Sequence, residues 1–249
     1  MAKYIHTPED REFGKDTEDW IFLNEHLGHD FGTVLHGLSG YIDEGIRGET
    51  IILNDFSEMK ILNEHINRIY DAIKFGYQKI AKENFSIKKI LQLNKEMLSK
   101  RELCVLIQDT PKIICYNIKN KIYLQYFNFV KNAYEHGFKN SQVPYEEKKI
   151  ILGAEVFPIS EEQLTYLGRN HNLYRVGEDF VRAYVKDNGC GIPEENLEKV
   201  FKRKPSTSER GVGLSLIDWV CDSIHGYASV ESEVGKGSEF SLYFARERK

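Results

Sequence analysis

The sequence has no proline between Pro8 and Pro111, so nothing of that kind interrupts a long helix there. Its four cysteines form no Cys-x-x-Cys pair, which argues against a structural zinc site or a disulfide framework. No apolar run approaches the roughly 20 residues of a membrane helix. Lysine and arginine, 34 together, do not outnumber the 38 aspartates and glutamates. We therefore expect a cytoplasmic protein with no membrane segment and no nucleic-acid partner.

The proline-free stretch carries two helical patterns. Apolar residues recur every three or four positions over residues 20–42 and again over residues 56–80, with a break at residues 47–49. This spacing predicts two long helices joined by a short loop, which form an antiparallel hairpin. One hairpin cannot bury both apolar stripes, so we expect two hairpins to pair as a four-helix bundle in a homodimer.

From about Phe85 onward, helical patterns alternate with short strand-like runs. We predict helices over residues 86–99, 119–136 and 214–225, and strands over residues 103–107 (buried), 150–157, 181–186, 228–232 and 239–244. A capping-box pattern at Ser160 and Gln163 predicts a short extra helix in the long connection 138–179. The fold class is therefore α+β, with a dimerisation and phosphoacceptor hairpin in residues 1–84 and an α/β sandwich in residues 85–249.

Four short motifs follow one another between residues 128 and 238. They are two asparagines one helical turn apart (Asn128 and Asn132), residues 187–191 directly after a predicted strand, residues 211–214 opening a helix, and residues 235–238 between the last two strands. Taken alone, residues 187–191 fit an ordinary turn after a strand, and the glycines at 211 and 213 fit a plain loop-to-helix junction. The ordered set of all four is much harder to obtain by chance.

The ordered motifs resemble the ATP-binding domain shared by sensor histidine kinases, DNA gyrase, the Hsp90 chaperone and the mismatch-repair protein MutL, over roughly residues 85–246. The resemblance implies an α/β sandwich that binds ATP with Mg²⁺. In such a site, the Asp187 carboxylate accepts the exocyclic amine of adenine. Gly189 and Gly191 let the backbone approach the base, and Ser238 supports the adenine pocket.

The resemblance also assigns residues to the phosphates. Backbone N–H groups at the start of the helix that Gly211, Gly213 and Leu214 open are suited to phosphate binding. The segment between residues 201 and 211 is rich in basic side chains, and from it we single out Lys204 and Arg210 as partners of the γ-phosphate. An ordinary solvated loop is the alternative for that segment.

Two asparagines are the candidate magnesium ligands. The amide oxygens of Asn128 and Asn132 suit an ion that keeps waters and phosphate oxygens as its other ligands. Family members that hydrolyse ATP usually carry a glutamate four residues before the magnesium asparagine, as the base that activates water. Asn128 stands at that position and cannot take a proton, so the resemblance narrows to the histidine kinases. One departure follows: Glu135 stands where the family often has lysine or arginine.

The first predicted helix contains a stretch, residues 29–35, that resembles the phosphoacceptor box of histidine kinases. It has His29, an acid, a threonine and a leucine in the expected order, with Val34 in place of the usual proline. On a helical wheel His29 also falls opposite the apolar stripe, where another domain can reach it. His26 lacks a following acid and His36 is followed by glycine, so both fit less well. A solvated helix histidine is the alternative.

The combined resemblance implies a two-component histidine kinase. It would phosphorylate itself on His29 and pass the phosphate to an aspartate of a response-regulator receiver domain. Asp30 would orient the imidazole and accept its proton. Thr33, one turn beyond His29, resembles the residue that positions water when such kinases act as phosphatases. Residues 1–16 are too few for a sensor domain, so we expect the signal from a separate or upstream sensor.

Two other functions stay open. A histidine phosphotransferase relay would use the same helices without ATP, but it would not need the glycines and Asp187 of the nucleotide motifs. A Ser/Thr kinase of the anti-sigma-factor type is favoured slightly by residues 132–136 and opposed by the long proline-free hairpin that carries His29.

Overall fold

The computed structural model describes residues 1–6, 82–98, 104–139, 141–201, 214 and 217–249, which belong to one structural unit. The predicted hairpin lies outside the described residues. The same holds for seven of the predicted site residues: His29, Asp30, Thr33, Lys204, Arg210, Gly211 and Gly213. No helix of the described part is long and apolar enough to span a membrane.

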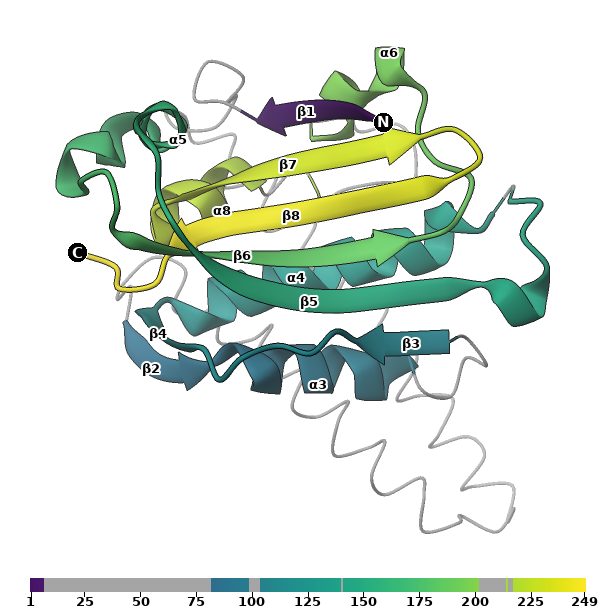
Figure 1. The fold of residues 1–249 in the computed structure, drawn as a ribbon, viewed down its shortest axis with the longest axis horizontal. Coiled ribbons are helices and arrows are strands. Elements are labelled where there is room, and N and C mark those ends of the chain that lie inside the picture. The colour runs from purple at the N-terminus through teal and green to yellow at the C-terminus, as the bar shows by residue number, and fades with distance from the viewer. Residues whose placement is uncertain (7–81, 99–103, 140, 202–213, 215–216) are drawn as a thin grey trace, which may run out of the picture. The chain divides into compact units, whose positions relative to one another are not determined.

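A six-stranded sheet organises the described part, with the strand order β1-β7-β8-β6-β5-β3 (Figure 1). The strands are β1 (Ala2–His6), β3 (Cys104–Ile107), β5 (Lys149–Pro158), β6 (Asp179–Asp187), β7 (Gly226–Glu233) and β8 (Gly237–Ala245). Neighbours pair antiparallel, except that β3 runs parallel to β5. The predicted β5, β6 and β7–β8 strands are confirmed within one or two residues at each end.

Helices cover one face of this sheet: α3 (Ile87–Leu98), α4 (Lys119–Asn132) and α8 (Ile217–Ile224) (Figure 1). Side chains alternate along each strand, so Val181, Ala183 and Val185 of β6 join the main core beneath the helices. The start of α4 is fixed by Asn117, whose buried side chain accepts from the Ile118 N–H at 2.7 Å and donates to the Ala245 carbonyl at 2.8 Å. With its start held in this way, α4 ends beside Asp187, the last residue of β6.

The opposite face of the sheet carries a second apolar cluster, made largely by the connection 138–179. Tyr227 and Tyr243 stack with ring centroids 4.4 Å apart, and Tyr166 packs edge-on against Tyr227. The predicted extra helix is confirmed as α5 (Glu161–Thr165). Both bonds of its capping box are present: Gln163 N–H to Ser160 Oγ at 3.2 Å, and Ser160 N–H to Gln163 Oε1 at 2.9 Å.

Three features differ from the sequence expectations. The strand over residues 103–107 is not buried: β3 lies at the sheet edge, and Leu106 is 40% exposed. A two-stranded sheet of β2 (Glu83–Ser86) and β4 (Ile114–Asn117) was not predicted. Residues 2–6, assigned with the hairpin in 1–84, instead form β1 and pair with β7, so this boundary requires correction. Such short strands are selected by distant partners, which a local pattern does not reveal.

Candidate functional site

The site centres on Asp187, the last residue of β6, whose side chain is only 3% exposed. The Gly189 N–H donates to Asp187 Oδ1 at 2.8 Å. Burial raises the pKa of the Asp187 carboxyl from its usual 3.8 to about 6, although backbone N–H groups of Gly189 and Ser238 act in the opposite direction. The oxygens of this buried carboxyl can accept a hydrogen bond from a ligand.

The end of α4 closes one side of this carboxyl. There the helix widens into a π-helical turn, Ala133–Gly137, a feature that often marks functional sites. The Cys190 N–H donates to the Gly137 carbonyl at 2.7 Å, which ties the turn to the loop after β6. A side chain at Gly189 would overlap the Gly137 carbonyl oxygen and crowd Asp187 Oδ1. Gly189 therefore permits the close approach on which the pocket depends.

The turn between β7 and β8 closes the other side. The Gly235 N–H donates to the Cys190 carbonyl at 2.8 Å. Gly191 has φ +70, and a Cβ there would overlap the Glu233 carbonyl oxygen, so glycine is required on both counts. Asp187, Gly189 and Gly191 of one sequence motif thus lie together with Ser238 of another.

Ser238 is 4% exposed and lies in a hydroxyl network rather than alone. Its Oγ is 3.0 Å from Ser232 Oγ, and the Ile192 N–H donates to that same Ser232 hydroxyl at 2.8 Å. Sequence reasoning missed Ser232, because no motif includes it. Its position on β7 links the loop after β6 to the β7–β8 turn.

The two predicted magnesium residues lie on α4, in the last turns before the π-helical turn that borders Asp187. Asn128 is buried and Asn132 is partly exposed. Their amide oxygens are hard donors of the kind that Mg²⁺ accepts beside water and phosphate, so the residues fit the ion. The pocket also fits adenine. The buried Asp187 carboxyl can accept the adenine amine, and Gly189 and Gly191 place no side chain in the space beside it. Leu214 is helical and partly exposed.

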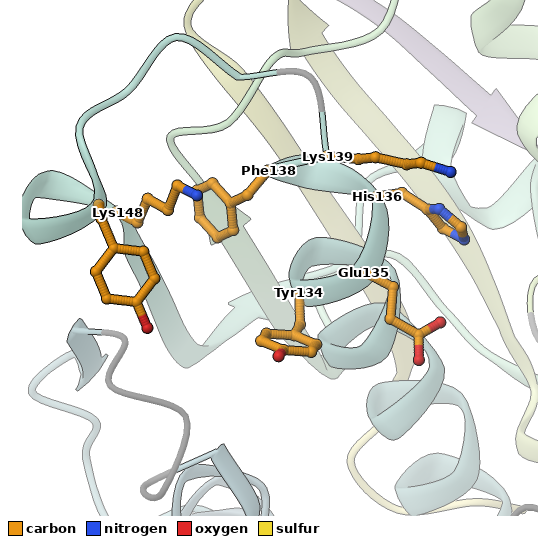
Figure 2. A pocket seen from close by; sticks show the side chains of 7 residues that line it. Tyr134, Glu135, His136, Phe138, Lys139 and Lys148 are labelled. Carbon is orange, nitrogen blue, oxygen red and sulfur yellow. The ribbon is translucent and has the colours of Figure 1, made fainter.

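A cavity of about 420 Å³ opens at the π-helical turn (Figure 2). Its lining residues are Tyr134, Glu135, His136, Phe138, Lys139, Tyr145 and Lys148. The Lys148 ammonium lies 5.6 Å from the centre of the Phe138 ring and 5.3 Å from that of Tyr145. The sequence analysis noted Glu135 as a departure from the family but did not identify Lys139 or Lys148 as neighbours of the site. The only sign of these two lysines in the sequence was that the connection 138–179 carries charged side chains.

Replacing Gly189 with alanine is expected to lower the melting temperature by about 2–12 °C, because an added methyl group in a closely packed position costs about 1–3 kcal/mol. Differential scanning fluorimetry measures this. Gly177→Ala is a comparison for backbone strain alone: Gly177 has φ +89, which disfavours alanine, but nothing lies within 4 Å of an added Cβ. Equal melting temperatures for wild type and Gly189→Ala would contradict the close approach.

The fold and the site together define a nucleotide-binding α/β domain. The family described as histidine kinase-, DNA gyrase B-, and HSP90-like ATPase matches residues 119–248, more than half of the sequence, and the chain belongs to this family. The full-length ShkA structure in complex with AMPPNP shares the fold, with a TM-score of 0.50 and 18% identity over 89% of this chain and 46% of that one.

Two curated relatives are sensor kinases. A probable C4-dicarboxylate sensor kinase of Halalkalibacterium halodurans is 45% identical over 78 residues, which are 29% of this chain and 15% of the relative. The sensor kinase CckA of Brucella abortus is 38% identical over 72 residues, which are 27% and 8% of the two chains. The matched region thus spans a small part of each relative.

Proposed function

We propose that the protein is a two-component histidine kinase that transfers the γ-phosphoryl group of ATP to His29 and then to an aspartate of a response-regulator receiver domain. The buried Asp187 carboxyl is the observation that carries the proposal. A buried ionisable group is costly, and three elements converge to enclose it. The sensor kinases among the relatives support the same reading.

Each part of the site has a defined task in this proposal. Asp187 accepts the adenine amine, and the Ser238–Ser232 pair supports the pocket wall. Asn128 and Asn132 would hold Mg²⁺, which neutralises phosphate charge when bound. Because an asparagine cannot act as the base for water, phosphate passes to a side chain rather than to solvent. Lys204, Arg210 and the residues Gly211, Gly213 and Leu214 are proposed to bind the phosphates.

The acceptor lies in the proposed helical hairpin, whose two helices are predicted by the apolar patterns over residues 20–42 and 56–80. Asp30 orients the His29 imidazole and takes its proton as the ring nitrogen attacks, and catalysis rests on positioning and charge stabilisation. We propose that the hairpin forms a homodimer through a four-helix bundle. The signal would come from a separate or upstream sensor domain.

Labelling with γ-³²P ATP and Mg²⁺, followed by acid and base treatment, tests the proposal. Label that is lost in acid and kept in base supports a phosphohistidine. Label that resists acid would indicate a Ser/Thr kinase of the anti-sigma type. An unlabelled protein that accepts phosphate from a phosphorylated regulator would indicate a relay.

Replacing Thr33 with alanine is expected to separate kinase from phosphatase activity, if Thr33 aligns water against the phospho-aspartate of the regulator. Self-phosphorylation would stay within about threefold of wild type, while regulator dephosphorylation would fall about tenfold, or roughly 1.4 kcal/mol. The assay follows loss of label from purified phospho-regulator with ADP present. An equal fall in both activities would assign Thr33 to helix structure alone.

A further inference from the structure

The N-terminal strand β1 joins the edge of the sheet beside β7 (Figure 1). Its register pairs Ala2 with Ser232 and His6 with Ala228. Alternate residues face opposite sides of the sheet. Tyr4 packs with the main core on the helix side, whereas Lys3 forms an ion pair with Glu231 at 2.7 Å. The strand therefore has a buried row, with Tyr4 and His6, and an opposite row in which Lys3 is exposed and Ile5 is partly buried.

The buried row of β1 packs against the Phe201 side chain. The Tyr4 and His6 rings lie 6.2 Å and 5.4 Å from the Phe201 ring, measured between centroids. Phe201 is 2% exposed and meets Phe240 of β8 edge-on at 6.2 Å. Aromatic pairs at such separations stabilise the packing beyond the area they bury. Phe201 is thus fixed from two sides, by the N-terminal strand and by the core of the sheet.

Phe201 ends the segment that leaves the adenine pocket. This segment runs from Ile192 through α6 (Glu194–Leu197) and the 3₁₀ turn Glu198–Val200. At its first residue, the Ile192 N–H donates to Ser232 Oγ, and Ser232 is the β7 residue that pairs with Ala2. Both ends of the segment are therefore attached to β7 or β1. In sequence, the residues proposed to bind phosphates follow directly after Phe201.

We propose that Tyr4 and His6 are positioning residues of the nucleotide site, so that docking of the N-terminal strand and binding of ATP favour each other. The inference rests on the proposed function, because it requires ATP in the pocket of Asp187. With Phe201 held, the segment 192–201 keeps its path from the adenine pocket, and in sequence it precedes the residues proposed to bind phosphates. Linkage makes the effect reciprocal: whatever the docked strand adds to ATP affinity, bound ATP adds to strand docking. The same strand leads into the predicted acceptor helix.

Three variants of the full chain test this with matched controls. Tyr4→Ala removes the ring that faces Phe201 and is expected to weaken ATP binding about fivefold or more by titration calorimetry, within the usual range of coupling between sites. Tyr4→Phe keeps the ring and should bind ATP with wild-type affinity. Lys3 lies on the same strand but on the opposite face, where it is exposed. Lys3→Ala should therefore change ATP affinity less than about twofold, as expected of an exposed ion pair.

Amide hydrogen exchange of the wild type supplies a readout that needs no variant. Saturating ATP and Mg²⁺ should slow exchange of the β1 amides about fivefold or more if the coupling is reciprocal. Unchanged β1 exchange in a wild type that binds ATP, together with a Tyr4→Ala variant of normal affinity, would overturn the inference and leave the proposed function intact. A wild type that does not bind ATP would overturn the proposed function itself.

Discussion

Replacement of His29 by glutamine is expected to abolish labelling of the protein by γ-³²P ATP, while ATP affinity stays within a few-fold of wild type. Glutamine keeps a polar side chain of similar length but has no ring nitrogen that can attack the γ-phosphorus. The adenine pocket is built from β6, the end of α4 and the β7–β8 turn, none of which includes residue 29. The measurement pairs acid-labile label incorporation with calorimetric titration of ATP.

His36→Gln is the matched control, because His36 lies on the same predicted helix and should label as wild type does. Full labelling of His29→Gln would refute the acceptor assignment, and loss of label in His36→Gln would then identify His36 as the acceptor. Equal loss in both variants would instead show that the helix itself had been disturbed. Circular dichroism of each variant separates that outcome from chemistry.

Replacement of Asp187 by asparagine is expected to weaken ATP binding by about 10- to 100-fold, since a hydrogen bond to a charged group contributes about 1.5–3 kcal/mol. The amide can still accept the Gly189 N–H, which now reaches Asp187 Oδ1 at 2.8 Å, but it offers no negative charge to the adenine amine. Calorimetric titration measures the loss. Asp179→Asn, an exposed position at the other end of β6, should bind ATP normally.

The pKa of Asp187 gives this variant a second signature. The folded pKa of about 6 lies above the usual 3.8, so between these values the folded protein binds more protons than the unfolded chain. The contribution of Asp187 to stability therefore falls as pH rises through this window, by about 3 kcal/mol in total. Asp187→Asn removes that cost and should be at least as stable as wild type in urea at pH 7.5.

ATP binding should follow the ionised form of the same carboxyl. Wild-type affinity is expected to rise with pH through about 6 and to level off above pH 7, because the charged form accepts the adenine amine best. Asp187→Asn should show little dependence over pH 5.2–7.5. Parallel pH profiles for the two proteins would place the titrating group elsewhere. An Asp187→Asn variant that unfolds more easily at pH 7.5 would contradict the burial cost.

Long or strongly patterned elements were predictable from local sequence. The helix α4, the strands β5 and β6 and the β7–β8 hairpin follow from apolar periodicity. The capping box at Ser160 follows from two side chains three residues apart. The proximity of Asp187, Gly189 and Gly191 was also predictable, because these positions carry backbone requirements, such as the positive φ of Gly191, that few residue types satisfy.

The remainder depends on partners that are far away in the sequence. Strands β1, β2 and β4 have four or five residues each, and their pairing rather than their composition makes them strands. Ser232 reads as an ordinary strand residue until the Ile192 N–H and Ser238 hydroxyl are seen beside it. The second apolar cluster could not be predicted either, because Tyr166 and Tyr243 lie in separate segments of the sequence.

The pairing of β1 with β7 also sets the order in which the domain can be completed during synthesis. Residues 2–6 leave the ribosome well before their partner, residues 226–233. Closing so distant a contact is slow and entropically costly, so β1 cannot join the sheet until β7 has been made. Until then, the edge of β7 and the apolar side of Tyr4 stay open to other chains. A chain in which β7 has formed but β1 has not yet docked should therefore be prone to edge-to-edge association.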